Sequence, residues 1–331
     1  MMKVARLSAV VVFLILIPQL LPAQLKSVKA AYPSVGGGQA PIWVAKEAGA
    51  FNRQGLDLDA ILIFGGNKIA QAMIAGELQI VQASQAPLIS ATLGGADLVF
   101  IANLYPTMVY SLYVVPEIQK PADLKGKKLG VTSYGAVIDF GTRMILKRFG
   151  LAPETDVAII QIGGQNNAVA AMAARGIHGA LLNPPASMEA LNLGMRELFD
   201  MRDLGVDYAF LGVAVSRAYW NRNPEVVERF MKAYLEGVSI AKKDSAFALR
   251  VLEKYTKVRD TKVLTETYRI FVQNALLEKP YTTSQGIQAN LDGLAPRLPA
   301  AKNAKPETFY DNRIIEKLDR SGYIQSLYQK K

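Results

Sequence analysis

The residues of this chain that could contact another molecule are mostly uncharged, hydrogen-bonding types that follow apolar, strand-like segments. Glycine, serine, asparagine, glutamine and tyrosine dominate seven such loops, at residues 36–39, 65–67, 84–85, 103–105, 133–135, 163–166 and 183–185. These groups can hydrogen-bond to a small molecule, stack on it and orient it. They include hardly any titratable group, so they offer no evident general base or nucleophile. The pattern therefore indicates a binding site rather than a catalytic centre.

The few titratable residues near these loops have structural interpretations. His178 is the single histidine, and its place before a strand, on the side away from the loops, favours a partly buried structural role. Asp139 and Arg143 lie four residues apart on an expected helix and would form a surface ion pair. Asp139 could instead reach the loops and hold an amino group. Tyr105 and Tyr134 could stack on a ligand ring or only pack against the protein.

No motif supports an enzyme or a cofactor site. The sequence contains no G-x-S-x-G, no G-x-x-x-x-G-K and no H-E-x-x-H segment. The glycine-rich loop misses the dinucleotide pattern because Pro41 stands where the last glycine should be. The absence of cysteine excludes disulfides, thiolate metal ligands and cysteine nucleophiles. We therefore expect no catalytic residues, no cofactor and no metal.

The segment at residues 32–51 predicts how the first loop is positioned. It has the pattern of a strand end, a loop of three glycines and a helix, with Pro41 suited to the first helical turn and Gly49 to a left-handed stop. Strand-like and helical segments then alternate with short loops, which favours parallel strands covered by helices on both faces. In such sheets ligands bind outside the carboxyl ends of the strands, where all seven loops would lie.

Two parts of the chain resemble each other at a spacing of roughly 100 residues. The segment ILIFGGN at residues 61–67 corresponds to IIQIGGQ at residues 159–165, and each precedes a helix and another strand. This similarity predicts two lobes of similar build. A strand at residues 210–216 would return the chain to the first lobe. A helix would begin after Asn223 and Pro224, with a buried face formed by Val227, Phe230, Met231, Tyr234, Leu235 and Val238.

The N-terminal segment and the net charge indicate the cellular compartment and the possible partners of the protein. Lys3 and Arg6 precede a short apolar run, so residues 1–23 have the order of a secretory signal peptide, with a retained signal anchor as the alternative. Cleavage would lower the formal net charge from +10 to +8, because it removes these two cations and no acid. The remaining basic residues are scattered, which predicts a solvated surface and no nucleic-acid partner. We expect a soluble periplasmic protein.

On these residues the chain resembles a periplasmic substrate-binding protein of an ABC importer, from the nitrate/sulfonate/taurine and thiamine-pyrimidine-precursor branch. The resemblance is carried by GGGQAPIWVAKEAGAFNRQGLDLD (36–59), IAGELQIVQASQAP (74–87), PADLKGKKLGV (121–131), NPEVVERFMKAYLEG (223–237) and YDNRIIEKLDRSGYI (310–324). It implies a monomeric α/β protein with a two-lobed, type II periplasmic-binding-protein-like fold. Its mixed sheets would be flanked by helices and joined by two crossover hinge strands.

The resemblance also implies boundaries, partners and a site. Lobe 1 would comprise residues 24–115 and 213–331 and lobe 2 residues 116–212, with crossover strands near Val115 and Gly212. A small ligand of sulfonate, taurine, pyrimidine or aromatic type would bind between the lobes, and hinge closure would present it to an ABC permease in the inner membrane. Nine residues would contact the ligand: Gly38, Gln39, Ser84, Gln85 and Tyr105 from lobe 1, and Ser133, Tyr134, Gly135 and Asn183 from lobe 2.

The sequence departs from the family pattern in ways that bear on the ligand. Gln79 and Gly179 replace an acidic residue often found where such strands open, and no loop arginine is placed to hold a sulfonate or nitrate by two parallel bonds. These departures favour a neutral, zwitterionic or aromatic ligand, although Arg143 and Lys68 could reach inward. Two alternatives to an importer component remain: a periplasmic ligand sensor acting on a receptor, and a thiamine-pyrimidine-synthase-like enzyme. The enzyme needs a cysteine- and histidine-containing motif that this chain lacks.

Overall fold

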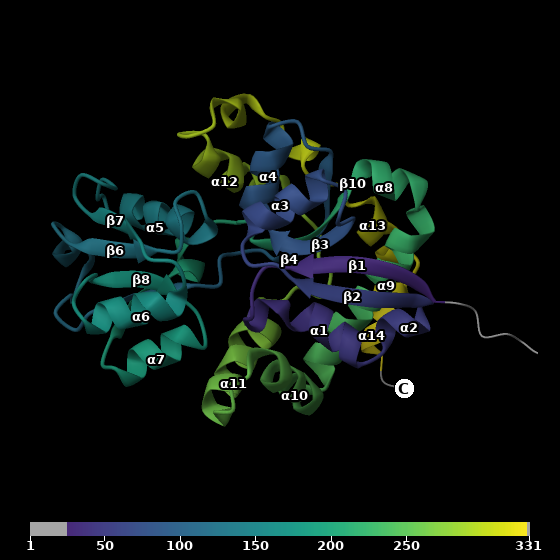
Figure 1. Cartoon of the computed structure of the whole chain (residues 1–331), viewed down its shortest axis with the longest axis horizontal. Helices are drawn as coiled ribbons and strands as arrows, with labels where there is room; N and C mark the ends of the chain where they lie inside the picture. Colours follow the sequence, from purple (N-terminus) through teal and green to yellow (C-terminus); the bar gives the residue numbers. More distant parts are fainter. Residues whose placement is uncertain (1–24, 330–331) are drawn as a thin grey trace, which may run out of the picture.

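The computed structural model describes residues 25–329, so the expected signal peptide at residues 1–23 lies outside the described residues. The described residues form two five-stranded mixed sheets, one in each lobe, which lie side by side (Figure 1). The first sheet has the order β2 (Leu56–Leu62), β1 (Lys26–Tyr32), β3 (Ile80–Ser84), β10 (Leu211–Ser216) and β4 (Leu98–Tyr105). The second has the order β7 (Ala158–Gln161), β6 (Lys128–Val131), β8 (Gly179–Leu182), β5 (Ser111–Val114) and β9 (Arg196–Asp200). The expected two-lobed α/β fold is thereby confirmed.

The two sheets have the same topology. The units β2–α3–β3 and β7–α6–β8 occupy equivalent positions, with α3 at Gly66–Ile74 and α6 at Gln165–Ala173. In each sheet the three strands β1–β3 or β6–β8 pair in parallel, and the fourth position holds an antiparallel strand, β10 or β5. The internal similarity at residues 61–67 and 159–165 therefore reflects two lobes of similar build.

The chain crosses between the lobes twice, and each crossing leads directly into an antiparallel strand. The first crossing differs from our expectation near Val115: β5 pairs with β8 and β9, so the chain has already entered the second sheet at Ser111. The second lies between β9 and β10, and β10 pairs with β3 and β4. The sheets thus place residues 111–114 with lobe 2, whereas the expected boundary placed them with lobe 1. The exact limits of the lobes stay a prediction.

Helices cover both sheets. Lobe 2 carries α5 (Val137–Arg148), α6 and α7 (Ala186–Asn192). Lobe 1 carries α3 and ten more helices: α1 (Ala40–Glu47), α2 (Ala50–Arg53), α4 (Gln85–Leu93), α8 (Arg217–Arg222), α9 (Pro224–Lys243), α10 (Ser245–Thr256), α11 (Thr261–Tyr268), α12 (Ser284–Leu294), α13 (Arg313–Arg320) and α14 (Tyr323–Tyr328). In Figure 1, α12 lies above the first sheet beside α4, and α10 and α11 lie below it.

The sequence signals around α1 and α9 have the expected structural consequences. Gly49 adopts a left-handed conformation at φ 69°, and the predicted apolar face of α9 is buried. The two helices meet at Gly237 of α9 and Ala45 of α1, and they are so close that a side chain at position 237 would place its Cβ only 2.4 Å from the Cβ of Ala45. Because glycine permits this close approach, α1 packs closely against α9. Asn223 does not cap α9 by its side chain and instead donates to the carbonyl of Tyr219.

Candidate functional site

The lobe 1 loop that begins with three glycines is held by a buried hydrogen-bond network. The carbonyl of Gly38 accepts bonds from Tyr105 Oη (3.2 Å) and Gln82 Nε2 (2.8 Å), and Gln82 Nε2 also approaches Gln39 Oε1 at 2.6 Å. Tyr234 donates to the other amide atom of Gln82. Gly38, Gln39 and Tyr105 are thus brought together, as expected of residues at one edge of a sheet.

The same network places these three residues inside lobe 1. Tyr105 is fully buried, and burial raises the pKa of its phenol well above the ordinary value, so it remains a neutral donor. Its ring packs edge-on against that of Phe271, with the ring centroids 6.1 Å apart, and Phe271 also covers Gly37 and Gly38. Here Tyr105 and Gln39 support the backbone of the loop, and the direct ligand contacts predicted for them stay a prediction.

Ser84 and Gln85 lie where β3 passes into α4. Gln85 is fully buried and donates through Nε2 to Asn103 Oδ1 at 2.9 Å. Its Oε1 and the Nδ2 of Asn103 have no hydrogen-bond partner among the described residues, although both atoms are buried. An unpaired buried amide atom costs about 1–3 kcal/mol. This pair therefore leaves two unpaired amide atoms at the lobe 1 edge.

In lobe 2, Ser133, Tyr134 and Gly135 form the turn between β6 and α5. The Tyr134 hydroxyl donates to the carbonyl of Ile159 on the edge strand β7 at 3.0 Å, although the residue remains about half exposed. Gly135 has φ 79°, a left-handed conformation that favours glycine, and its N–H donates to Asp139 Oδ2 at 2.7 Å. The structure keeps these residues adjacent, and their contact with a ligand stays a prediction.

Asn183 lies apart from that turn, beside the first crossing between the lobes. Its Oδ1 accepts from Gln165 Nε2 at 3.1 Å, and its Nδ2 donates to the carbonyl of Val109 at 3.2 Å. It lines a cavity of about 200 Å³ that we call the interlobe pocket. The walls come from the crossing segment, from lobe 2, and in lobe 1 from α11 and the start of the π-helical segment Arg269–Ala275: Val109, Tyr110, Ser111, Tyr113, Leu182, Asn183, Pro184, Ser187, Glu197, Asp200, Arg202, Glu266, Arg269 and Ile270.

The interlobe pocket is polar, and its charged residues were not identified from the sequence. Arg202 Nε donates to both carboxylate oxygens of Asp200, at 3.0 Å to Oδ1 and 2.9 Å to Oδ2. Arg269 Nε donates to Glu266 Oε2 at 2.8 Å. The hydrogen bond from Arg269 lowers the pKa of Glu266 most, and the charge of Arg202 on the opposite lobe lowers it further. Both arginines lie outside the seven strand-end loops, so only their positions in space connect them with the site.

A second feature missed by the sequence analysis joins the lobes on the side of α12. Asp139 is buried and forms ion pairs with Arg143 (2.8 Å) and with Arg297 (2.9 Å), which follows α12 in lobe 1. Next to it, Phe140 fills the space over Gly293, where a Cβ would lie 1.3 Å from the ring. The predicted pair of Asp139 and Arg143 forms, but its surface location is wrong, because Asp139 is buried in a contact between the lobes.

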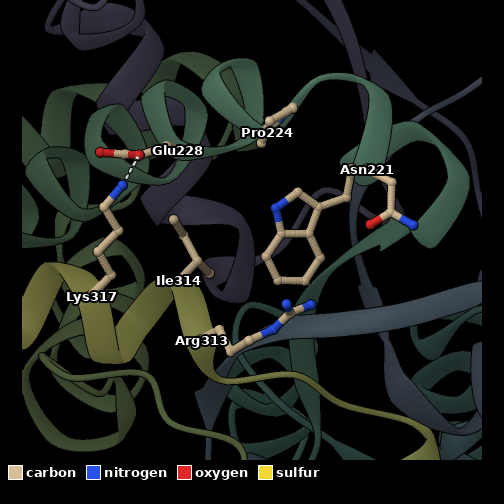
Figure 2. A pocket seen from close by; sticks show the side chains of 7 residues that line it. Asn221, Pro224, Glu228, Arg313, Ile314 and Lys317 are labelled. Carbon is tan, nitrogen blue, oxygen red and sulfur yellow. Dashed lines mark hydrogen bonds and ion pairs between the residues drawn. The ribbon is translucent and has the colours of Figure 1, made fainter.

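A larger cavity of about 270 Å³ lies elsewhere on lobe 1, between α8, α9 and α13 (Figure 2). Arg313 lies over the ring of Trp220 at 5.1 Å, and Lys317 pairs with Glu228 at 2.6 Å. None of the nine predicted site residues lines it, and all its walls belong to one lobe. A ligand there could not connect the two lobes.

Other expectations concern groups outside these cavities. His178 accepts a hydrogen bond from the N–H of Lys128 through Nδ1 (3.3 Å), and its place between β6 and β8 agrees with a structural role. Burial, aided by nearby lysine charges, lowers its pKa. Within residues 25–329 there is no group of three or more potential metal ligands. The helices of that part of the chain are all too short or too polar to cross a membrane.

Comparisons with known proteins identify the family. The sequence profile of the NMT1/THI5-like family matches residues 38–247. A binding protein of Brucella abortus (strain 2308) is 27% identical over 228 residues, which cover 67% of this chain and 69% of that protein. A binding protein of Brucella suis biovar 1 matches to the same extent.

Solved structures agree with the fold. The periplasmic aliphatic sulphonate-binding protein of Escherichia coli superposes with a TM-score of 0.73 at 17% identity, over 86% of this chain and 91% of that one. The periplasmic nitrate-binding protein of Synechocystis PCC 6803 gives a TM-score of 0.70 at 11% identity, over 93% and 92%. The fold is that of periplasmic binding proteins. With the profile matching more than half of its length, the chain belongs to the NMT1/THI5-like family.

Proposed function

We propose that this protein captures a small organic solute between its two lobes in the periplasm and delivers it to the permease of an ABC importer, without a catalytic step. One observation carries the proposal: the interlobe pocket takes its walls from both lobes and from the segment that joins them. A solute bound there would contact both lobes, so its binding free energy would favour the arrangement in which they meet. The family membership and the names of the structurally similar proteins support a solute-binding role without specifying the solute.

The nine predicted contact residues remain part of this proposal. Asn183 is the one that lines the interlobe pocket, and Ser133, Tyr134 and Gly135 lie at the other loop of lobe 2. Gly38, Gln39 and Tyr105 would act mainly by fixing the loop of lobe 1, since Tyr105 donates to the carbonyl of Gly38 and Gln39 accepts from Gln82. Because Asn183 and residues 133–135 lie on different loops of lobe 2, their contributions can be tested separately.

The experiment is a thermal-shift screen of the mature, ligand-stripped protein against sulfonates, nitrate, taurine, pyrimidines and aromatic acids. A ligand present at 100 times its dissociation constant adds about 2.7 kcal/mol to the stability of the folded state, which is readily measured. We expect at least one class to stabilise the protein. Stabilisation by none of them, in a protein shown to be folded, would contradict the proposal for these solutes.

Variants then locate the hit. We expect Asn183→Ala to weaken the ligand-induced shift, whereas Asn167→Ala should not, because Asn167 does not line the interlobe pocket and its side chain makes an exposed hydrogen bond to the carbonyl of Ile162. The double change Ser133→Ala with Tyr134→Ala should abolish the shift if that turn also contacts the solute. An unchanged response in both the Asn183 variant and the double variant would refute the site assignment.

A further inference from the structure

The charged groups of the interlobe pocket leave specific hydrogen-bonding positions unused. Arg202 and Arg269 each contact their own carboxylate through Nε and Nη2. Neither Nη1 group makes a hydrogen bond to any residue in the described part of the chain. Arginine presents five N–H donors in a planar fork that suits an oxyanion. Each lobe thus contributes one partly used guanidinium to the same cavity.

Glu197 has the complementary property. Its Oε2 accepts a hydrogen bond from the Tyr113 hydroxyl at 3.0 Å, while its Oε1 accepts none from residues 25–329. Burial raises the pKa of the Tyr113 phenol and the charge of Glu197 raises it further, so the tyrosine stays a neutral donor. Glu197 is therefore the one pocket carboxylate paired with a hydroxyl rather than with a guanidinium.

The charge balance of the pocket restricts what it can hold. Three carboxylates, Glu197, Asp200 and Glu266, face two guanidiniums, which leaves one formal negative charge in excess. A simple anion would add to that excess, and a simple cation would leave the free guanidinium donors without a partner. A molecule that carries both an acidic group and an ammonium group satisfies both sets of atoms.

The size of the cavity gives a second restriction. A cavity of about 200 Å³ is smaller than the usual ligand pocket of about 300–1,000 Å³. The pocket therefore suits a small solute.

We propose that the interlobe pocket binds a small amino-acid-like zwitterion, with its acidic group between Arg202 and Arg269 and its ammonium group at Glu197. The inference rests on the proposed solute-binding function and names the solute class. Because Arg202 belongs to lobe 2 and Arg269 to lobe 1, the acidic group of the solute links the two lobes directly. Arg202 and Arg269 would then be binding residues, and Glu197 would select against acids that lack an amine.

The test is isothermal titration calorimetry of the full mature protein with five probes of similar size. β-Alanine and taurine carry both charges, propionate and ethanesulfonate lack the amine, and ethylamine lacks the acid. We expect binding of at least one zwitterion at least tenfold tighter than of its amine-free counterpart and of ethylamine. The carboxylate and sulfonate arms show which oxyanion the guanidiniums prefer. Equal binding of propionate and β-alanine, and of ethanesulfonate and taurine, would overturn the proposal.

Two substitutions separate this inference from the general function. We expect Arg269→Gln to weaken zwitterion binding at least tenfold, and Glu197→Gln to remove the preference for the amine. Arg217→Gln is the matched control, because Arg217 pairs with Asp97 on lobe 1, outside the pocket, and should leave binding unchanged. If a solute from the wider screen binds but neither pocket substitution affects it, the solute-binding function stands and this inference fails. If no solute binds to the folded protein, the proposed function itself fails.

Discussion

Removing the Arg297 side chain should shift the two lobes toward an open arrangement. Arg297 Nη1 lies 2.9 Å from Asp139 Oδ2, and this ion pair joins the segment after α12 in lobe 1 to α5 in lobe 2. The side chain of Asp139 is only 2% exposed, whereas that of Arg297 is 46% exposed. The contact is therefore intermediate between a surface pair and a buried pair.

The size of the effect follows from what Asp139 retains. Leaving a buried charge without any partner costs about 3–5 kcal/mol, whereas an exposed pair contributes about 0.2–1 kcal/mol. In Arg297→Ala, Asp139 still has Arg143 at 2.8 Å and the N–H of Gly135 at 2.7 Å. We therefore expect a loss of about 1–2 kcal/mol in the free energy of lobe contact, close to a tenfold change in the ratio of closed to open molecules.

Small-angle X-ray scattering of the ligand-free protein measures this change. We expect a larger radius of gyration for Arg297→Ala than for the unaltered protein, and a larger increase still for Asp139→Asn, which weakens both ion pairs of Asp139. Arg320→Ala is the control, because Arg320 is 82% exposed and meets Glu316 at 3.7 Å within α13. If Arg297→Ala is folded and scatters as the control does, the contact does not hold the lobes together and the reasoning is refuted.

Two further predictions concern lobe 1 alone. In urea unfolding, Gly37→Ala should destabilise the protein by about 1–3 kcal/mol, because the new Cβ would lie 2.3 Å from the ring of Phe271. The control is the adjacent Gly36→Ala, which has open space at its Cβ and should change the stability by less than about 0.5 kcal/mol. Glu228 has a lowered pKa, chiefly through its hydrogen bond to Lys317, so its contribution to stability is complete above the ordinary carboxyl pKa and is lost as the pH falls through the lowered value. The measurement is the midpoint of urea unfolding as a function of pH. In Lys317→Met this midpoint should fall less on acidification than in the unaltered protein, and an unchanged pH profile would show that the pair does not contribute to stability.

Much of the fold could be predicted from the sequence because it depends on patterns within a few residues. Gly49 adopts the predicted left-handed conformation, and the predicted face of α9 is buried, since helical periodicity decides which side chains share a face. The glycine-containing strand–helix units at residues 61–67 and 159–165 also indicated two similar lobes correctly, because each unit folds through local contacts. The family resemblance extended this to two crossings between the lobes.

The interlobe features could not be predicted because their partners are far apart in the chain. Asp139 and Arg297 are 158 residues apart, and their pairing depends on how α12 meets α5. Arg202 and Arg269 reach one pocket only because the chain crosses between the sheets and later returns α11 to the lobe boundary. The sequence by itself determined two α/β lobes with hydrogen-bonding loops at their strand ends. Only the tertiary structure decided which charges face each other between the lobes, because electrostatic contact depends on distance in space and not on separation along the chain.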